Sequence, residues 1–375
     1  MQATRLELDG VRGVGKVSLE LRKEQKVYAF IGANGIGKTK TLEALFQLVF
    51  FNNTQVVNLK GHLGSSFPFS FSSFKWGDSS CIHAPANTGT VLTNCLTQNK
   101  DSFPHSNAVI FLGSQNRGFV HHQKQTAKEL GSLQERRSRY LKAVIEGMKN
   151  NFTRLNMGDG IENWFVSLAQ SANRFQKKED NREVEIETLL KLLNQIDQRI
   201  DSEFLEIDGD GRVSLKVEGQ KRQLEHLSSG FASLLKILQA IISGYGYFTN
   251  ETQLQKVRGQ VFIDEIESHL HLGWQAKILP LLKRLFPNTT FYVTTHSSIV
   301  LAQLKEGEAY RLERDEKGVV HNRLIPQPNK SALVDVLKDA FELDINQLKL
   351  DSLTAEGQQE AKSQLLKLVK HKREA

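Results

Sequence analysis

The sequence is poor in the residues and segments that build disulfide frameworks, metal clusters and membrane spans. Only two cysteines, Cys81 and Cys95, occur among 375 residues. They have no metal-ligand spacing and no partner set, so neither a disulfide framework nor a zinc site is expected. No run of about 18 apolar residues occurs, and the first ten residues mix apolar with charged side chains. We therefore expect no membrane span and no secretory leader, and the cytoplasm as the location.

The bulk composition is that of an ordinary globular protein. Hydrophobic residues make up 39% and charged residues 24% of the chain. The length suits one large α/β domain with insertions, or two closely joined lobes. A net charge of +7 suggests a polyanionic partner only weakly, because the same balance is common in proteins that never touch nucleic acid.

The first motif that carries chemistry follows a short apolar run at 27–31. It reads Gly32-Ala33-Asn34-Gly35-Ile36-Gly37-Lys38-Thr39 and matches the phosphate-loop pattern G-x-x-x-x-G-K-[ST]. A strand before it and a helix after it, at 41–51, are the context that this motif requires. Glycines let main-chain N–H groups point at phosphate oxygens. Lys38 can then reach the β- and γ-phosphates, and the Thr39 hydroxyl can ligate Mg²⁺.

An apolar strand that ends in two carboxylates lies far downstream, at 261–265. Asp264 at the strand end can hold the Mg²⁺ shell opposite Thr39. Glu265 is then placed to orient and deprotonate an attacking water as a general base. A single Asp-Glu pair can also face solvent at a strand end, but the phosphate loop upstream favours the catalytic interpretation.

Two weaker signals flank this acidic strand. Leu227-Ser228-Ser229-Gly230 opens a strongly apolar helix, and a Ser and a Gly at a helix start form an anion-binding end. Gly230 lies 34 residues before Asp264 (264 minus 230). Another apolar strand ends in His296, which can donate to a γ-phosphate oxygen. Alone, a capping serine or a lone histidine is usually structural, but their order around the stronger motifs favours a role at the nucleotide.

The stretch between the motifs predicts an insertion. Residues 52–107 are rich in Ser, Asn, Gly and Phe and predict an irregular segment with a few strands, followed by a short strand at 109–113. Apolar residues at three- and four-residue spacings predict helices over about 124–157 and 183–204.

Asp208-Gly209-Asp210-Gly211 joins two short runs, 204–207 and 212–217, and predicts a β-hairpin. A calcium loop is the weaker interpretation of this segment, because its twelfth position would be Val217, which offers no carboxylate.

Together these residues resemble the ABC-type ATPase superfamily, and within it the RecF/SMC-like branch and the AAA-type ATPases of the overcoming-lysogenization (OLD) and bacterial defence groups. The resemblance covers 3–50 and 222–300 well. It implies that 32–39 is the Walker A motif, Asp264 the Walker B aspartate, Glu265 the catalytic glutamate and His296 the switch histidine.

The resemblance also implies that 227–230 is the ABC signature, with Ser228 and Gly230 contacting the γ-phosphate of a neighbouring protomer. The signature reads Ser-Ser-Gly-Phe rather than Ser-Gly-Gly-Gln, so the strength of that contact stays open. Residues 267–271 occupy the place of the D-loop, where the family pattern makes a Leu-His run more typical than a metal site. Gln115, just after the strand at 109–113, is the best candidate for the Q-loop glutamine.

The predicted site residues follow from the motifs and the resemblance. The predicted nucleotide contacts are Asn34, Gly35, Gly37, Lys38, Thr39, Thr41, Ser228, Gly230 and Gln115. The predicted catalytic residues are Glu265 and His296, and the predicted Mg²⁺ ligands are Thr39 and Asp264. The cofactors are therefore expected to be ATP and Mg²⁺.

The predicted fold is α/β, a P-loop NTPase of the ABC-ATPase type, with a mixed sheet and an inserted helical lobe. The N-terminal part of the ATPase lobe, with Walker A and an irregular insertion, takes up 1–120. A helical insertion lobe follows at 121–205. The rest of the ATPase lobe, with signature, Walker B and switch histidine, spans 206–330, and a helical tail spans 331–375.

The resemblance implies an ATPase that dimerises, or forms a larger homo-oligomer, around two ATP molecules. Because 79 residues follow His296 (375 minus 296) and contain no Asp-x-Asp pair, we expect no nuclease module there. The first hypothesis is an ATPase subunit that controls a separately encoded effector, a nuclease or a toxin, in anti-phage defence. The alternative is a RecF-like DNA repair or maintenance ATPase that clamps DNA; a transporter ATPase is disfavoured by the long insertion.

The two favoured hypotheses differ in where basic residues should lie. A DNA clamp should gather Arg136, Arg137, Arg139 and Lys142 on one face around the dimer groove. A scaffold subunit should instead show an apolar partner surface on its insertions.

Overall fold

The structure, a computed structural model, describes residues 3–57, 67–77, 79–81, 104–122, 129–158, 160–172, 175–177, 179–341 and 347. The strands are β1 (Ala3–Val11), β2 (Gly15–Arg22), β3 (Val27–Ile31), β4 (Ser73–Trp76), β5 (Ser79–Cys81), β6 (Ala108–Leu112), β7 (Ile200–Ile207), β8 (Val213–Val217), β9 (Gln220–Gln223), β10 (Gly259–Ile263), β11 (Thr289–Thr294), β12 (Ala309–Arg314) and β13 (Val320–Leu324). The helices are α1 (Lys38–Phe51), α2 (Thr54–Val57), α4 (Leu133–Asn150), α5 (Ile161–Ser171), α6 (Glu183–Ile196), α7 (Ser229–Phe248), α8 (Leu272–Gln275), α9 (Ile278–Leu285), α10 (Ser298–Leu301) and α11 (Leu333–Phe341), with short 3₁₀ turns at Phe152–Arg154, Leu224–His226 and Leu254–Lys256.

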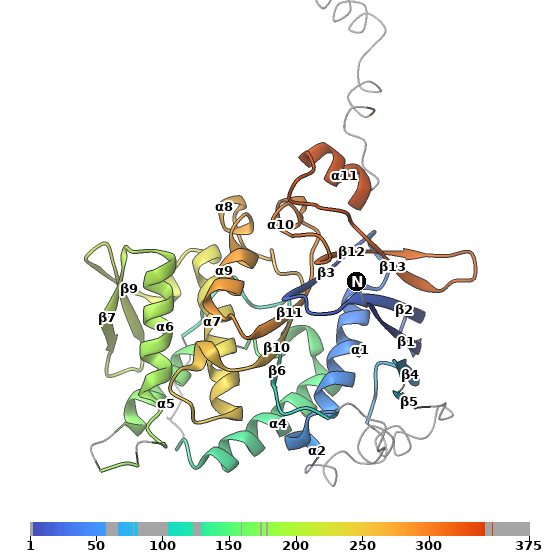
Figure 1. Cartoon of the computed structure of the whole chain (residues 1–375). Coiled ribbons are helices and arrows are strands. Elements are labelled where there is room, and N and C mark those ends of the chain that lie inside the picture. The colour runs from blue at the N-terminus through green and yellow to red at the C-terminus, as the bar shows by residue number, and fades with distance from the viewer. Residues whose placement is uncertain are drawn as a thin grey trace, which may run out of the picture.

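A ten-stranded mixed sheet runs through the molecule in the order β5-β4-β1-β2-β13-β12-β3-β11-β10-β6 (Figure 1). Strands β12, β3, β11, β10 and β6 are parallel to one another, whereas β13 is antiparallel to β12, and β2, β1, β4 and β5 form an antiparallel run at the other edge. This mixed sheet confirms the predicted α/β fold class. Because the central strands are parallel, the segments that follow β3, β6, β10 and β11 meet along one side of the sheet, the edge formed by the carboxyl ends of these strands.

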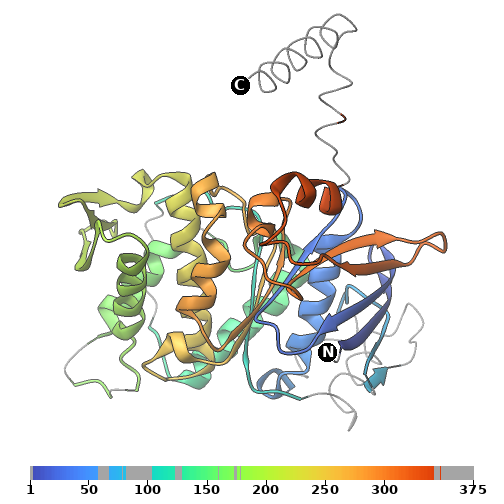
Figure 2. The ribbon, with the colours of Figure 1, turned by 45° about the horizontal axis from the view of Figure 1, so that its top comes forward.

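Two consecutive residues of β6 show that both faces of the sheet are covered. Ile110 packs against α7, where a Cβ built on Gly244 would lie 2.4 Å from Ile110 Cδ1, so this glycine lets helix and strand approach closely. Phe111 faces the other way, with its ring centroid 5.2 Å from that of Phe46 in α1. Since side chains alternate along a strand, α1 and α7 lie on opposite faces of the sheet (Figure 1 and Figure 2).

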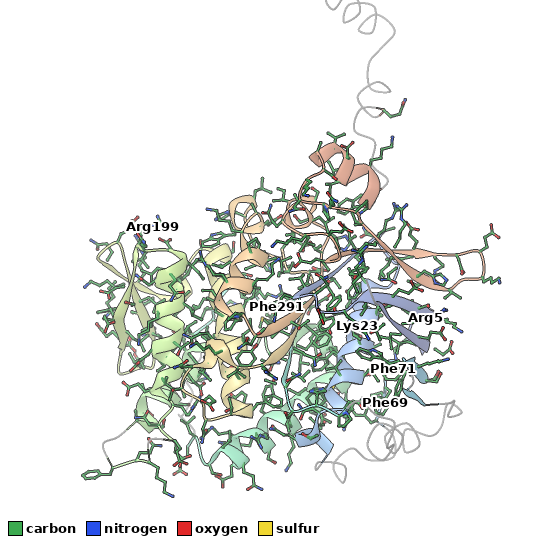
Figure 3. The ribbon with its side chains drawn as sticks, viewed as in Figure 1. Arg5, Lys23, Phe69, Phe71, Arg199 and Phe291 are labelled. Carbon is green, nitrogen blue, oxygen red and sulfur yellow. The ribbon has the colours of Figure 1, made fainter. Side chains whose placement is uncertain are left out.

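An aromatic row ties the central strands together. Tyr28 of β3 stacks on Tyr292 of β11 with ring centroids 5.0 Å apart, and Tyr292 stacks on Phe262 of β10 at 4.6 Å. The three residues are paired in register, so their rings stand side by side on one face. Phe291, the neighbour of Tyr292, lies in the middle of the sheet (Figure 3). Burial on both faces explains why these strands are continuous apolar runs in the sequence.

Helix α7 is long and apolar enough to cross a membrane by length and composition, with a mean hydropathy of 1.2 over its window. Within the fold, however, 83% of that window is buried. The helix lies between the sheet and α6 (Figure 1). The protein core therefore accounts for its apolar side chains.

The helical lobe consists of α4, α5, α6 and a separate three-stranded sheet, β7-β8-β9. Helix α6 and this small sheet lie at one end of the molecule, where Arg199 is labelled, whereas α4 runs across toward α2 (Figure 1 and Figure 3). Helix α4 begins at Leu133 because Ser132 and Glu135 form a reciprocal capping box. Helix α5 and strand β9 were not predicted from the sequence.

The predicted helix over 183–204 is wrong beyond Ile196. Asp197 leaves the helical conformation, with φ −139° and ψ 104°, and Asn194 Nδ2 donates to Ile200 O at 2.6 Å. Ile200 then pairs with β8 as part of β7. Apolar spacing continues across the break, but pairing with the neighbouring strand decides the local structure.

The predicted hairpin at the Asp-Gly turn is confirmed. Ile207 of β7 pairs with Val213 of β8. The Asp208 carboxylate accepts from the main-chain N–H groups of Asp210 and Arg212, both at 2.9 Å. These two bonds close the turn without a ligand.

The predicted irregular segment at 52–107 contains α2, β4 and β5 where the structure describes it. Its phenylalanines pack beside α1: the Phe67 ring centroid lies 5.3 Å from that of Phe51 and 4.8 Å from that of Phe69. Phe69 and Phe71 point into this packed edge (Figure 3). The remainder of this segment, and most of the predicted tail beyond α11, lie outside the described residues.

Candidate nucleotide site

The phosphate loop joins β3 to α1 at the edge where the parallel strands end. Gly32, Gly35 and Gly37 have φ values of 150°, 79° and 104°, a conformation that side chains rarely adopt. A Cβ on Gly37 would lie 2.5 Å from Val14 Cγ2. The loop's conformation therefore favours glycine at all three positions, and at Gly37 the β1–β2 turn that covers the loop leaves no room for a side chain.

Lys38 opens α1 and is only 6% exposed. Its Nζ donates to Gly32 O at 2.8 Å and to Ala33 O at 3.0 Å. Burial lowers the pKa of Lys38, and the carboxylates that follow β10 act in the opposite direction. The ammonium group is thus bound to two carbonyls of the phosphate loop. Phosphate oxygens could replace these carbonyls as acceptors of charge-assisted hydrogen bonds.

The other two loop predictions have contrasting surroundings. Asn34 is exposed at the tip of the loop. Thr41, one turn into α1, is fully buried, and its hydroxyl has no hydrogen-bond partner among the described residues. Both assignments stay predictions.

Thr39 and Asp264, the predicted Mg²⁺ ligands, lie together although 225 residues separate them. The Thr39 hydroxyl donates to Asp264 Oδ1 at 2.9 Å, and the Thr294 hydroxyl donates to the same oxygen at 2.7 Å. Adjacent oxygen ligands of an octahedral Mg²⁺ are about 2.9 Å apart, so the pair fits that ion. No group of three or more His, Cys, Asp or Glu is close enough to hold a metal among the described residues. Phosphate oxygens and water would complete the shell.

Glu265 stands at the turn that leaves β10. Its φ is 47°, in the left-handed region, and its N–H donates to the Thr294 hydroxyl at 2.8 Å. Its carboxylate accepts from Ser268 Oγ at 3.0 Å. The side chain is half-buried. A carboxylate held in this way beside the candidate metal site can orient a water molecule and accept its proton.

His296 follows β11 at the same edge and is exposed. Its main-chain N–H donates to Glu267 Oε1 at 2.5 Å. The other oxygen of Glu267 is buried without a hydrogen-bond partner in the described part of the chain. Sequence reasoning placed Glu267 in the D-loop without a role; the structure makes it a third carboxylate near Lys38.

The predicted signature segment lies against the turn after Glu265. Ser228 is exposed and caps α7, accepting from Phe231 N at 3.4 Å. Gly230 is buried, and a Cβ there would lie 3.4 Å from His269 O. Ser233, one turn further, donates to Ser268 O at 3.1 Å. The exposed start of α7 therefore adjoins the D-loop and faces outward.

Gln115, the Q-loop candidate, follows β6 at the same edge of the sheet. Its N–H donates to Thr153 O at 3.0 Å, and its side-chain oxygen accepts from Arg154 Nε at 3.3 Å. The side chain is thus held by Arg154, and its role toward nucleotide stays a prediction.

Comparison with known proteins bears on this site directly. The family model described as "AAA domain, putative AbiEii toxin, Type IV TA system" matches residues 27–302, which include the phosphate loop, Glu265 and His296. The chain belongs to this family of AAA domains.

Relatives of this AAA domain include the Septu protein PtuA of Bacillus thuringiensis, 24% identical over 90% of this chain and 84% of that protein. The Retron Vc95 probable ATPase of Vibrio cholerae is 26% identical over 42% of this chain and 38% of its own length. The Retron Ec83 probable ATPase of Escherichia coli is 39% identical over 16% and 13%. These matches confirm the resemblance drawn from the motifs.

Among solved structures, the SmcHead bound to the C-winged helix domain of ScpA is similar to this chain. The TM-score is 0.46 and the identity 14%, over 88% of this chain and all (100%) of that one.

Sequence reasoning missed Arg117, which lies behind the candidate site of this AAA domain. Arg117 is completely buried, at 0% exposure. Its Nε donates to Gly113 O at 2.7 Å, its Nη1 to Glu265 O at 3.0 Å, and its Nη2 to Asp264 O. Burial lowers the pKa of Arg117 to about 10, so the guanidinium stays charged at neutral pH. The sequence could not predict this role, because a single arginine after the candidate Q-loop glutamine belongs to no recognisable motif.

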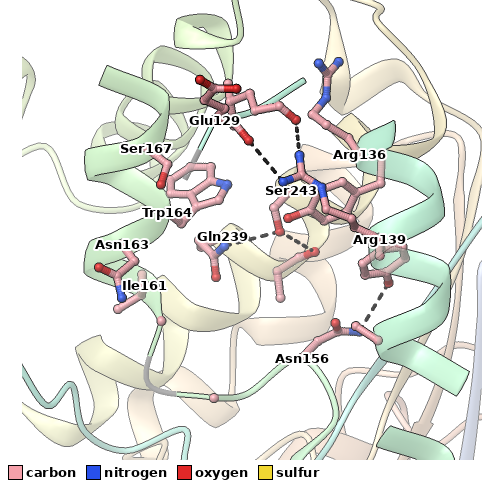
Figure 4. A pocket seen from close by; sticks show the side chains of 17 residues that line it. Glu129, Arg136, Arg139, Asn156, Ile161, Asn163, Trp164, Ser167, Gln239 and Ser243 are labelled. Atoms are coloured by element: carbon pink, nitrogen blue, oxygen red, sulfur yellow. Dashed lines mark hydrogen bonds between the residues drawn. The ribbon is translucent and has the colours of Figure 1, made fainter. Parts of the chain in front are cut away.

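The basic residues expected to mark a DNA clamp are mostly engaged in the helical lobe. Arg136 is buried and donates to Gly131 O at 2.6 Å. Arg137 donates to the last carbonyls of α7, and Arg139 to two carbonyls that precede α4 (Figure 4). Lys142 is exposed, with no side-chain partner among the described residues. Three of the four side chains are therefore bound to main-chain carbonyls of this part of the protein, and Arg137 joins α4 to the end of α7.

The helical lobe also contains a cavity of about 490 Å³ between α4, α5 and α7 (Figure 4). Trp164 and Ser167 line it from α5, and Gln239 and Ser243 from α7. Gln239 Nε2 donates to Ser243 Oγ at 3.2 Å. We nevertheless place the nucleotide at the phosphate loop, because glycine-rich backbone, lysine and metal-binding oxygens meet there and not in this cavity.

Proposed function

We propose that this protein is a Mg²⁺-dependent ATPase subunit that dimerises around ATP and controls a separately encoded effector, a nuclease or a toxin, in anti-phage defence in the cytoplasm. The observation that carries the proposal is the 2.9 Å contact between the Thr39 hydroxyl and Asp264 Oδ1, with Lys38 and Glu265 at the same edge. Oxygen ligands, a phosphate-binding lysine and a held carboxylate are the parts that phosphoryl transfer to water requires.

Each residue has one step in the proposed reaction. Lys38 leaves the Gly32 and Ala33 carbonyls and binds phosphate oxygens. Glu265, held by Ser268, orients the attacking water and takes its proton. Thr39 and Asp264 would hold Mg²⁺, which would neutralise negative charge on the phosphates. His296 donates to a γ-phosphate oxygen as the bond to the leaving group breaks.

A second copy of the chain would complete the site. Ser228 and Gly230 lie at the start of α7, beside the D-loop of their own protomer. An exposed helix start whose capping serine hydroxyl can still donate its proton suits the γ-phosphate of a partner's nucleotide. Hydrolysis would then release the dimer or change its shape, and this movement would be the signal to the effector.

The effector and the defence role rest on resemblance and on relatives. Relatives that carry the names Septu protein PtuA and retron ATPase support the assignment to defence systems. The alternative, a RecF-like clamp on DNA, has less support, because three of the four basic side chains that would line the clamp are bound within the helical lobe.

The test measures ATP turnover and mass in solution for the wild type and for Glu265→Gln, with and without duplex DNA. We expect Glu265→Gln to lose about 10²- to 10⁴-fold in turnover and to accumulate as an ATP-bound dimer or larger assembly. The matched control is Glu187→Gln on the exposed face of α6, which should behave like the wild type.

Three results would count against the proposal. Wild-type turnover in Glu265→Gln would remove Glu265 as the base. A monomer that hydrolyses ATP at the full rate would remove the dimer. Strong stimulation of turnover by DNA would favour the DNA clamp over control of an effector.

A further inference from the structure

The strands β10 and β6 end side by side, and the chain leaves each by a turn that contains a residue in the left-handed conformation. Glu265 has a φ of 47° and Asn116 a φ of 64°. Neither residue is glycine, so each conformation must be imposed by its surroundings. One side chain, Arg117, contacts both turns.

Arg117 holds these turns through main-chain atoms alone. Its hydrogen bonds go to the carbonyls of Gly113, Asp264 and Glu265. Within the described part of the chain no carboxylate forms an ion pair with the guanidinium, although the charges of Asp264, Glu265 and Glu267 act on it. The planar fork of arginine can donate in three directions at once, and neither lysine nor methionine can reproduce this. The fork therefore fixes where the two carboxylates stand relative to the phosphate loop.

The residue before Arg117 extends this contact to the signature helix. Lys236 of α7 is 2% exposed, and its Nζ donates to Asn116 O at 2.7 Å. Ser233, on the preceding turn of α7, donates to Ser268 O at 3.1 Å. The carboxylate turn and α7 are thus joined twice, once directly and once through the segment 116–117.

Close packing completes this linked group, defined here as 113–118, 264–271 and the first two turns of α7. A Cβ on Gly118 would lie 2.5 Å from His269 Nδ1, so the two turns are in direct contact. Gly230 packs on the carbonyl of the same histidine. A shift of either turn must therefore move its neighbours, because close-packed interiors transmit displacement.

We propose that Arg117 is the positioning residue for Asp264 and Glu265, and that with Lys236 it couples these carboxylates to the signature helix of the same protomer. A change at one nucleotide, sensed by the carboxylate turn, would then alter the helix start that contacts the other nucleotide. The role in turnover rests on the ATPase proposed above, whereas the mechanical coupling is a property of the chain alone.

The experiment compares Arg117→Met, Arg117→Lys and Lys236→Met with Arg137→Met as the matched control. Arg137 also donates to main-chain carbonyls of α7, but at the far end of the helix. Two readouts are taken for each variant: kcat and ATP affinity, and amide hydrogen exchange without nucleotide over 259–271, 229–238 and 241–250.

We expect Arg117→Met to lose about 10²-fold in kcat, the size expected when catalytic groups move by about 1 Å, with ATP affinity changed less than about threefold. Exchange should rise at 259–271 and 229–238. Lys236→Met should raise exchange at 229–238 and lower kcat less, and the double variant should be less than additive. Arg137→Met should raise exchange only at 241–250 and leave kcat unchanged.

The variant Arg117→Lys tests whether the guanidinium geometry or only the positive charge is needed. Arg117→Lys keeps a cation but not the fork, so we expect kcat to stay well below wild type. Full recovery by lysine would overturn the positioning role. Unchanged exchange at 229–238 in both Arg117→Met and Lys236→Met would overturn the coupling, as would a uniform rise across the chain.

The two proposals can fail separately. If the wild type does not hydrolyse ATP, the proposed function is wrong, and the exchange measurements alone then decide the coupling. If the wild type hydrolyses ATP and Arg117→Met does so equally well, the ATPase stands and the positioning role falls.

Discussion

The nucleotide edge and the helical lobe both bury charged side chains, but they satisfy them differently. At the nucleotide edge the partners are neutral: Lys38 and Arg117 donate to main-chain carbonyls, and Asp264 accepts from two threonine hydroxyls. The helical lobe also contains a buried pair of opposite charges, since Arg182 Nε lies 2.8 Å from Glu185 Oε1 with both side chains buried. The first arrangement leaves charge that a ligand can neutralise, and the second does not.

The partners of a buried charge, neutral or oppositely charged, distinguish the candidate site from the rest of the fold better than residue type does. Arg136 and Arg137, which the sequence offers as DNA contacts, bind carbonyls within the helical lobe. Arg117, which the sequence does not mark, lies between the two carboxylates and the signature helix. A buried cation marks the candidate site when its neutral partners belong to the loops that a nucleotide would contact.

The largest expected effect at the nucleotide edge comes from Lys38→Met. We expect roughly 10³-fold lower turnover, because the phosphates lose a preorganised cation. Without nucleotide the variant should be no less stable than the wild type, since burial already lowers the pKa of Lys38 and disfavours its charge. An ATP turnover assay measures the first effect, and thermal unfolding with and without ATP measures the stability and its increase on ATP binding.

Lys142→Met is the control for Lys38→Met, because Lys142 is an exposed lysine of the helical lobe. It should leave both turnover and the stabilisation by ATP unchanged. A Lys38→Met protein that still gains stability from ATP would show that the nucleotide binds elsewhere, and the comparison of the two regions would break.

In the helical lobe the largest effect should come from Arg182→Met, which leaves Glu185 buried without its partner. We expect a loss of about 3 kcal/mol in the free energy of unfolding, the low end for a broken buried pair, because Glu185 can take up a proton. Turnover of the folded protein should be close to wild type. Urea unfolding, with Lys191→Met of the exposed Lys191–Glu187 pair as the control, measures this.

The same variant has a pH dependence whose sign follows from Glu185. Burial raises the pKa of Glu185 above its ordinary value of 4.5, and Arg182 opposes this shift. Without Arg182 the folded state binds more protons than the unfolded state, so stability should fall as pH rises above about 4.5. A loss that is independent of pH between 4 and 8 would show that repacking, not the unpaired carboxylate, causes it.

The sequence predicted which segments meet at the nucleotide edge of the sheet, because their motifs are local. The local conformation of each motif can be predicted from the residues next to it in the chain. This holds for the glycines at 32 and 37, for the apolar strands before Asp264 and His296, and for the serine that caps α7. Parallel strand order then brings those segments to one edge. Thr294 could have been found in the same way, as the last residue of the strand that ends before His296.

Other features of the fold and of the candidate site could not be predicted from neighbouring residues in the sequence. Ile196 and Ile200 keep a helical spacing, yet the chain turns into β7 between them because β8 is available for pairing. Arg117 acquires its role only when β6 and β10 lie side by side. Such features depend on contacts between distant segments, which one sequence does not display.

The smallest expected effect sharpens the comparison from the scaffold side. Ser132 caps α4 by accepting from Glu135 N at 3.4 Å, and Glu135 bonds back to the Ser132 N–H. We expect Ser132→Ala to cost about 1 kcal/mol of stability and to leave turnover unchanged, since α4 meets α7 at Tyr247 and Phe248, the end of that helix opposite the signature segment. If this small change lowered kcat, α4 would transmit to the signature helix, and the helical lobe would belong to the catalytic machinery rather than to its support.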